Sequence, residues 1–150
     1  MGQQTVADIV RGRKSDDLIS VDAGATVAEA VEVMAAREVG AVLAKNEDGL
    51  VAGIFSERDL LVQVVRRGLD PKTTPLSLVM TRDVRFVSPG TTTEAALSMM
   101  HLLGFRHLLV IDGPHVHGLV SMRDLVFQMV RCGEGRFEAA VREVEPEASK

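Results

Sequence analysis

The chain has 150 residues, enough for one compact domain or for two small packed repeats with a proper core. Hydrophobic residues make up 46% and charged residues 25%, an ordinary globular balance that excludes a largely disordered chain. Because 17 Lys and Arg stand against 21 Asp and Glu, the net charge is −4, which argues against general binding to a nucleic-acid backbone. Trp and Tyr are absent, so no stacking platform for nucleic-acid bases is evident.

Cysteine content and hydropathy restrict the class of protein further. The single Cys132 excludes an internal disulfide framework and a multi-cysteine zinc site. The opening segment, MGQQTVADIVRGRKSDD, lacks an apolar core long enough for a signal peptide, and no stretch approaches the ~20 apolar residues of a membrane span. These features predict a soluble, cytoplasmic protein that does not associate with membranes.

An internal duplication organises the chain. Residues 17–43 align with residues 83–109, and the octapeptide GIFSERDL at 53–60 recurs as GLVSMRDL at 118–125. Two blocks that recur in the same order and at nearly the same spacing indicate a tandem repeat. The predicted organisation is a first repeat at 5–68, a linker at 69–75, a second repeat at 76–131 and a tail, partly helical or disordered, at 132–150.

Each repeat is predicted to be an α/β (α+β) unit with the order strand, helix, strand, strand, helix. The first repeat has an extended segment at 18–21, two strands at 40–44 and 50–55 joined by an Asp-Gly turn, and a helix that begins after Ser56. The second repeat has its predicted strands at 84–87, 107–111 and 116–120, and its last helix begins after Ser121.

The helix between the first two strands has a clear signature. Thr26 and Glu29 have the spacing of a capping box, which marks a helix start. The apolar residues that follow recur at i, i+3, i+4 and i+7, the pattern of one buried helix face: Val27, Ala30, Val31 and Met34. A further helical piece is expected in the tail, at 136–144.

A Ser-x-Arg-Asp box lies in each repeat where a strand passes into a helix. The simplest interpretation is structural, with Ser as the N-cap and Asp completing a capping box. However, each Arg lies in a first helical turn, where the macrodipole disfavours a cation, and this suggests a nearby anion. A carboxylate suits the paired hydroxyls of a ribose, and Ser and the first amides suit phosphate. The boxes comprise Ser56, Arg58 and Asp59, and Ser121, Arg123 and Asp124.

This duplicated Gly-h-h-Ser-x-x-Asp-Leu pattern resembles a tandem pair of cystathionine-β-synthase (CBS) domains, the Bateman module, over residues 5–131. The resemblance implies two βαββα repeats packed through their sheets about a pseudo-two-fold axis, and a stand-alone pair that forms a homodimer. It also implies two clefts for adenosine-containing ligands of the class of AMP, ADP, ATP, NAD or S-adenosylmethionine. Such a ligand would be regulatory rather than a catalytic cofactor.

The resemblance also implies roles for particular residues. By the family pattern, Asp59 and Asp124 would hold ribose, whereas Ser56 and Ser121 would lie near the ribose and the phosphate. The strand residues expected to line the base pocket are Ser20, Val21, Phe86 and Val87.

The two repeats differ in their anion-binding chemistry. The second has Arg106 and His107 before its middle strand, where the family often carries a basic pair, and the first has Gly40 and Ala41 there. We therefore expect at least one occupied cleft and two clefts that are not equivalent. The cations and hydroxyl that would add to the richer second half are Arg123, Thr81 and Arg82.

Other functions compete with nucleotide binding. His115 and His117 could bind a metal, but because no third ligand is apparent a solvated turn is favoured and no metal site is predicted. The absence of a Walker-A loop and of a Gly-x-Ser-x-Gly elbow ranks a small enzyme below a binding module. The prediction is a non-catalytic sensor that binds an adenine nucleotide and changes shape or affinity for a protein partner. The alternative is a homodimeric scaffold in which the boxes are only helix caps.

Overall fold

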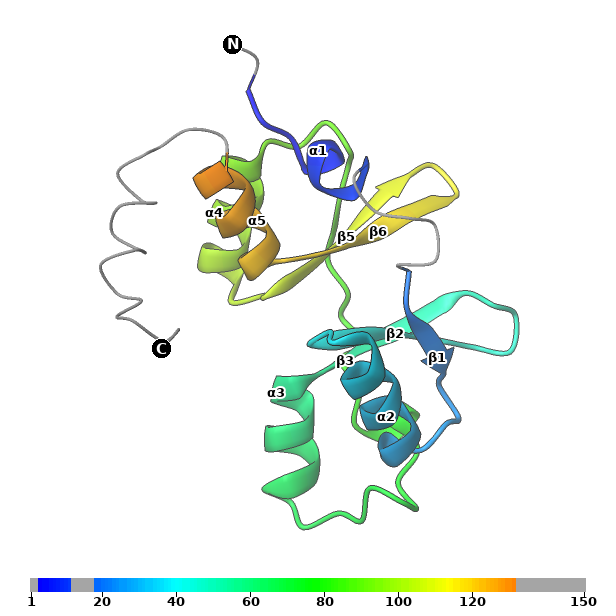
Figure 1. The fold of residues 1–150 in the computed structure, drawn as a ribbon. Coiled ribbons are helices and arrows are strands. Elements are labelled where there is room, and N and C mark those ends of the chain that lie inside the picture. Colours follow the sequence, from blue (N-terminus) through cyan, green and yellow to red (C-terminus); the bar gives the residue numbers. More distant parts are fainter. Residues whose placement is uncertain (1–2, 12–17, 132–150) are drawn as a thin grey trace, which may run out of the picture. The chain divides into compact units, whose positions relative to one another are not determined.

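The computed structural model describes residues 3–11 and 18–131. The chain divides into two compact units, and Figure 1 labels the helices and strands of both. Of the described residues, the first-repeat unit comprises 18–84, and the second-repeat unit combines 3–11 with 85–131. Cys132 and the helix expected at 136–144 lie outside the described residues.

A mixed three-stranded sheet forms the centre of the first-repeat unit. Its strand order is β1-β2-β3, with β1 parallel to β2 and β2 antiparallel to β3. The last helix begins as a short α-helical segment and continues as a π-helix, whose wider turns are rare in proteins. The elements are β1 (Ser20–Asp22), α2 (Val27–Arg37), β2 (Ala41–Lys45), β3 (Val51–Ser56), α3 (Glu57–Asp59), the π-helix η2 (Leu60–Val65) and the 3₁₀ helix η3 (Leu76–Leu78).

The second-repeat unit repeats this arrangement. Its sheet has the order β4-β5-β6, again with one parallel and one antiparallel pair. The elements are α1 (Val6–Arg11), β4 (Phe86–Val87), α4 (Thr93–Leu103), β5 (His107–Asp112), β6 (His115–Ser121) and α5 (Met122–Arg131). The predicted α/β fold of two β-α-β-β-α units is therefore confirmed, with strand ends that differ from the sequence prediction by one or two residues.

Local sequence signals explain where α2 begins and ends. The Thr26 hydroxyl accepts from the Glu29 amide at 3.2 Å, and the Glu29 carboxylate accepts from the Thr26 amide at 2.8 Å. The predicted capping box is thus present, and it satisfies an amide at the helix N-terminus that has no intrahelical partner. At the other end, Glu38 takes a left-handed conformation, and Gly104 does so after α4.

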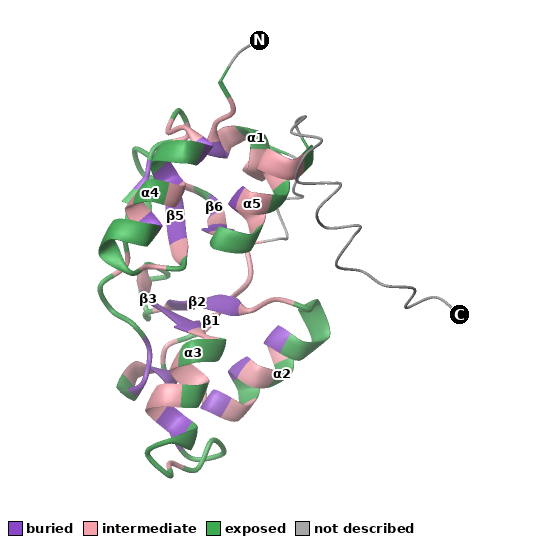
Figure 2. Cartoon of the chain, turned by 90° about the vertical axis from the view of Figure 1, so that its left-hand side faces the viewer, coloured by how far each residue is buried: buried purple, intermediate pink, exposed green. Residues whose placement is uncertain are grey.

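Each unit has its own apolar core between the sheet and the helices, and Figure 2 shows buried residues on β2 and β5. The segment that opens each repeat in sequence packs into the core of the other repeat. Leu76, Val79 and Met80 lie in the core of the first-repeat unit, and Val6 lies in that of the second. Burial of such side chains stabilises by about 1.5–3 kcal/mol each, so these exchanged segments are integral parts of both units.

The segment at 69–75, interpreted from sequence as a linker, contacts the first-repeat unit. The Val27 amide donates to the Thr74 carbonyl and the Ala28 amide to the Pro71 carbonyl, both at 2.9 Å. These bonds satisfy amides in the first turn of α2, which have no partner within the helix. The chain between the repeats is therefore anchored on one side. In the described residues, no helix has the length and apolar character needed to cross a membrane.

Candidate functional site

Strand pairing brings several candidate residues of the second repeat onto one face of its sheet. Phe86 pairs with Leu109 and His107 pairs with Ser121, and residues paired across strands or two apart in one strand point to the same side. Phe86, His107 and Ser121 therefore share a face. From Phe86 to Ser121 the distance across β5 is roughly 12 Å, given the usual strand spacing and rise. The opposite face carries the core residues Val87, Leu108, Val110 and Val120.

Because side chains alternate between the two faces of a sheet, the residues expected to line a base pocket do not all lie on one face. Phe86 is 64% exposed, whereas its neighbour Val87 is 6% exposed and belongs to the core. Ser20 occupies the position of Phe86 in the first-repeat unit and is half-buried, and Val21 packs against that unit's core. The structure thus brings Phe86, and not Val87, to the face that carries Ser121.

In the first repeat, Ser56 and Asp59 form a capping box. Oδ2 of Asp59 accepts from the Ser56 amide and from the Ser56 hydroxyl, both at 3.0 Å, and the Asp59 amide donates to Oγ of Ser56 at 3.3 Å. The structural interpretation of this box is therefore confirmed. The bonds also hold the carboxylate in one orientation, which is the requirement for a hydrogen-bond acceptor that recognises a ligand.

The second box has the same geometry. The Ser121 amide donates to Oδ2 of Asp124 at 2.8 Å, and the Asp124 amide donates to Oγ of Ser121 at 3.1 Å. Both Asp side chains are half-buried, at the point where the last strand of each sheet passes into a helix. The duplication in sequence is thus a duplication of side-chain geometry.

Thr81 joins the first box from a distant part of the chain. Its Oγ1 donates to Oδ1 of Asp59 at 3.0 Å, and its backbone pairs with Ile54 through two hydrogen bonds. Gly53 permits this approach, since a Cβ there would lie 2.7 Å from the Thr81 carbonyl oxygen and 2.9 Å from Sδ of Met80. This close approach explains why glycine, which has no Cβ, stands at position 53, the start of the octapeptide in the first repeat.

The equivalence of Arg106 and Gly40 also follows from backbone hydrogen bonds. The Met122 amide donates to the Arg106 carbonyl, and the Glu57 amide donates to the Gly40 carbonyl, both at 3.0 Å. Because His107 lies opposite Ser121 in the ladder, the Arg106-His107 pair adjoins the second box. Arg106, next to this box, is exposed.

The remaining arginines have different environments. Arg58 is exposed and has no hydrogen-bond, ion-pair or ring partner in the part of the chain that is described. Arg123 lies over the ring of Phe127, with 5.4 Å from Cζ to the ring centroid. This cation–π contact accounts for a cation in the first turn of α5 without a bound anion. Arg82 donates to the Ser77 carbonyl at 2.8 Å and so braces the segment around Thr81.

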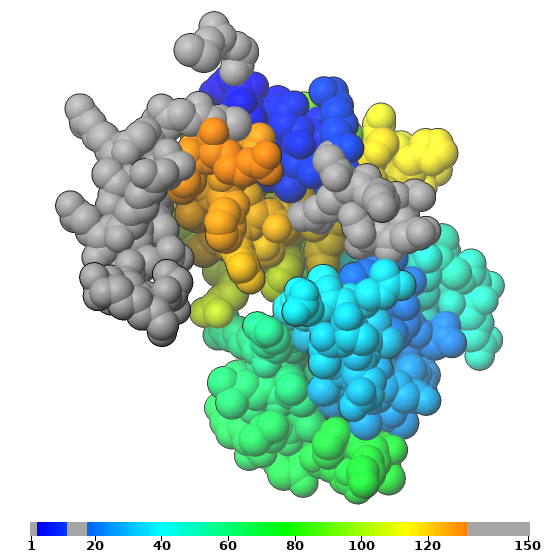
Figure 3. Space-filling model, in the orientation of Figure 1, coloured from blue at the N-terminus to red at the C-terminus, as the bar shows by residue number. Residues whose placement is uncertain are grey.

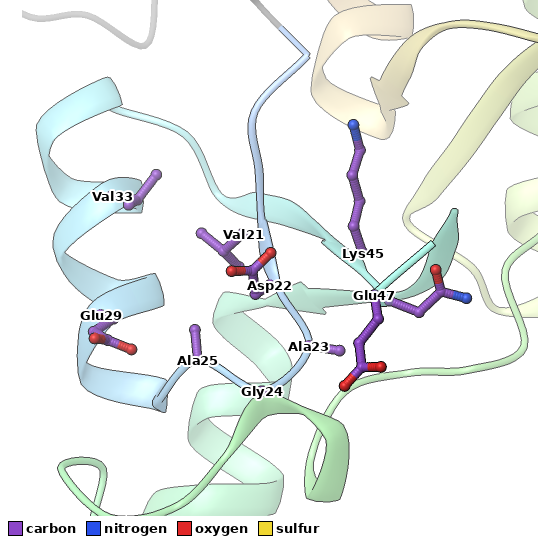
Figure 4. Close-up of a pocket in the computed structure, with 10 residues that line it drawn as sticks. Val21, Asp22, Ala23, Gly24, Ala25, Glu29, Val33, Lys45 and Glu47 are labelled. Carbon is purple, nitrogen blue, oxygen red and sulfur yellow. The ribbon is translucent and has the colours of Figure 1, made fainter. Parts of the chain in front are cut away.

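A hollow in the first-repeat unit lies away from these boxes, between the β1–α2 turn and the β2–β3 turn (Figure 4). Val21 is the one predicted site residue that lines it. Its acidic side chains, Asp22, Glu29 and Glu47, outnumber Lys45, a charge balance that disfavours phosphate. The residues that line it are Val21, Asp22, Ala23, Gly24, Ala25, Glu29, Val33, Lys45, Asn46 and Glu47.

The histidines of the second hairpin do not gather into a larger cluster. Nε2 of His117 lies 3.9 Å from Oδ2 of Asp112, and His115 is exposed at the turn. Within residues 3–11 and 18–131, no group of three or more His, Cys, Asp or Glu side chains is arranged to hold a metal ion.

Two β-α-β-β-α units, each with a Ser-Asp box after its third strand, define a class of tandem α/β repeat modules. The family model of the CBS domain matches residues 6–66 and 76–131. The chain therefore belongs to the CBS-domain family and carries two tandem CBS domains, the arrangement called a Bateman module.

Relatives of known sequence include small and large proteins. The uncharacterized 17.7 kDa protein in the bps2 3' region of Acidianus ambivalens is 32% identical over 120 residues, which cover 79% of this chain and 71% of the relative. CBS domain-containing protein YhcV of Bacillus subtilis is 28% identical over 77% of this chain and 81% of its own length. CBSCBSPB2 of Arabidopsis thaliana is 32% identical over 86% of this chain, which spans only 23% of that relative.

Solved structures share the fold. A CBS-domain protein from Burkholderia ambifaria has a TM-score of 0.80 and 32% identity, with 87% of this chain and 97% of that chain covered. The CBS domain protein PAE2072 from Pyrobaculum aerophilum, complexed with AMP, has a TM-score of 0.68 and 24% identity over 80% of this chain and 88% of that chain. The second likeness shows the fold alone.

Proposed function

We propose that this CBS pair is a non-catalytic regulatory module that binds an adenine nucleotide. The observation that carries the proposal is the shared face of the second-repeat sheet, which carries the exposed Phe86, the half-buried His107 and Ser121 of the second box. The AMP in the complex of the Pyrobaculum protein supports this ligand class.

The chemistry of that face fits the parts of a nucleotide. The exposed ring of Phe86 offers a surface on which a flat base stacks. Asp124, as an acceptor with fixed orientation, suits the ribose hydroxyls, and Arg106 with His107 suits the phosphate. Ser121 lies between these groups, directly opposite His107. AMP, ADP, ATP, NAD and S-adenosylmethionine all carry the adenosine part of this pattern.

Thr81 connects the first box to a part of the chain that lies 22 positions after Asp59. Because Oδ1 of Asp59 accepts from Thr81, a ligand that binds this carboxylate acts on the segment that follows the linker and leads into the second-repeat unit. A ligand changes the conformation only to the extent that it binds one state better than the other. We infer that the position of this segment differs between the free and the bound state, and that a protein partner binds the two states with different affinity.

We also propose that the protein is a homodimer. Several large apolar side chains of the second-repeat unit are exposed, and α5, which carries two of them, forms part of its surface (Figure 3, orange). Such side chains on helices favour burial against a second copy. The hexameric CBS-CP12 protein is an oligomeric structure with the same fold. The exposed residues are Leu102, Leu103, Met122 and Phe127.

One observation favours a different function. Both boxes are complete capping motifs, and the guanidinium of Arg123 makes a cation–π contact with the ring of Phe127. These residues therefore have structural roles without any ligand. An interaction scaffold of two CBS domains is therefore the second candidate. A scaffold and a sensor differ in one measurable property, the saturable binding of nucleotide.

Calorimetric titration with AMP, ADP, ATP, NAD and S-adenosylmethionine tests the proposal. Asp59→Asn and Asp124→Asn keep an acceptor for the cap and remove the charge, so they separate ligand binding from folding. We expect saturable binding of at least one ligand and its loss in one of the two variants, with thermal midpoints near that of the parent. Absence of binding to the parent by all five ligands would reject the sensor in favour of the scaffold.

A further inference from the structure

The two boxes differ in the charge of one pair of neighbouring positions. Residue 40 and residue 57 are joined by a backbone hydrogen bond, as are their equivalents, residues 106 and 122. In the first repeat this pair is Gly40 and Glu57, and in the second it is Arg106 and Met122. The pair at the first box thus contributes a carboxylate, and the pair at the second box contributes a guanidinium.

The side chain of Glu57 folds over Gly40. A Cβ built at Gly40 would lie 3.4 Å from Cδ and from Oε2 of Glu57, and 3.7 Å from Oε1. The space from which the Arg106 side chain extends in the second repeat is therefore filled by a carboxylate in the first. An arginine at position 40 would have to displace or pair with Glu57.

The negative charge of Glu57 has no ion-pair partner among residues 3–11 and 18–131. Glu57 is exposed and makes no ion pair with any described residue, and the neighbouring Arg58 does not bond to it. With Glu57 and Arg58, the first box has one added charge of each sign, whereas Arg106 and Arg123 give the second box two positive charges. Both boxes have the same Ser-Asp pair, but the net charge of the residues beside that pair is two units more positive at the second box than at the first.

We propose that Glu57 sets the ligand charge accepted at the first box. Its carboxylate disfavours a phosphate next to the ribose and favours an adenosine compound whose 5′ substituent is neutral or cationic. The second box, with Arg106, accepts the phosphorylated ligand. This inference rests on the proposed binding of adenosine-containing ligands, and it assigns different members of that class to the two boxes.

Adenosine, AMP and S-adenosylmethionine are the probes, because they carry a neutral, an anionic and a cationic 5′ group. Asp124→Asn serves as the parent, so that the first box is measured alone, and Glu57→Gln is introduced into it. Glu47→Gln, which removes another exposed carboxylate of the same unit, is the matched control. We expect Glu57→Gln to raise the affinity for AMP relative to adenosine by about three- to tenfold, and to lower that for S-adenosylmethionine.

Salt provides a second readout. Since the effect is Coulombic and exposed, the gain in AMP affinity should shrink when the ionic strength is raised to about 0.5 M, and Glu47→Gln should show no gain at any salt concentration. The reciprocal variant is Met122→Glu in an Asp59→Asn background, which should weaken AMP binding at the second box. Thermal midpoints near those of the parents establish that the variants fold.

The outcomes separate this inference from the proposed function. If the unmodified protein binds none of the three probes, both are rejected. If it binds AMP but Glu57→Gln and Met122→Glu leave the AMP-to-adenosine ratio within twofold of their parents, only the charge selection is rejected. Loss of all binding in Asp124→Asn would likewise reject a ligand at the first box while the second box stands.

Discussion

Thr81 and Asp59, 22 positions apart, are joined by a hydrogen bond of 3.0 Å from Oγ1 to Oδ1. The other carboxylate oxygen of Asp59 is bonded to Ser56, so this side chain connects the start of a helix with the segment after the linker. Each carboxylate oxygen has two acceptor positions, and Oδ1 therefore retains capacity for a ligand hydroxyl. A ligand hydroxyl bound to Oδ1 would share this atom with Thr81.

Thr81→Val tests this connection, because it removes the hydroxyl and preserves the side-chain shape. We expect the free energy of unfolding to fall by about 0.5–1.5 kcal/mol, the usual contribution of one hydrogen bond. Urea denaturation measures the change. Thr73→Val, at an exposed threonine whose side chain bonds to none of the described residues, is the control and should change stability much less. Equal effects of the two substitutions would contradict a stabilising role for the bond.

Gly53→Ala tests the close approach of the Thr81 segment to β3. The added Cβ would lie 2.7 Å from a backbone oxygen, which cannot move without breaking the pairing with Ile54. We expect a loss of about 1–3 kcal/mol in the free energy of unfolding. Gly24→Ala, where a Cβ meets nothing within 4 Å, should be neutral or slightly stabilising. A Gly53→Ala protein as stable as the parent would show that the segment does not lie against the strand in solution.

The contact between Arg123 and Phe127 can be measured by a double-mutant cycle. Arg123→Met and Phe127→Leu, singly and together, should give a coupling of about 0.5–1 kcal/mol in the free energy of unfolding, as expected for an exposed cation–π pair. Phe127→Leu should also release the guanidinium toward the second box and raise AMP affinity there. No coupling would remove the structural explanation for Arg123 and strengthen the case for an anion beside it.

Leu102→Lys tests the proposed homodimer. Leu102 is 79% exposed near the end of α4, and a charge there should oppose burial against a second copy. We expect a shift from dimer toward monomer in sedimentation velocity. Leu50→Lys, at the exposed β2–β3 turn, should leave the dimer intact. A parent protein that is monomeric at all concentrations would reject the dimer, and an unaffected Leu102→Lys dimer would place its interface elsewhere.

Local features of the fold were predictable from sequence because their causes are local. The capping box of Thr26 and Glu29 depends on residues three apart, and its predicted hydrogen bonds are all present. Strand and helix order followed from periodicity and from the duplication. The π-helical form of η2 was not predicted, because the apolar run at Leu60–Val65 is compatible with any buried helix.

The less predictable features depend on contacts between distant segments. Nothing in the local sequence shows that Thr81 bonds to Asp59. The two side chains meet because Gly53, which lacks a Cβ, lets the backbone of Thr81 lie close to β3. By contrast, the stacking of Arg123 on Phe127 could have been inferred, since residues four apart on a helix are neighbours. The roles of the Asp residues toward ribose stay predictions that await the binding measurements.

The exchange of opening segments has a consequence for how the chain acquires its structure. A fragment that ended at residue 68 would lack Leu76, Val79 and Met80 from the core built by its own sheet, and its Val6 would have no core to enter. Neither CBS repeat, cut out at its sequence boundaries, therefore contains all of its interior. The first-repeat unit has its whole core once the chain reaches residue 84, whereas the second-repeat unit needs α1 from the start of the chain as well as residues 85–131.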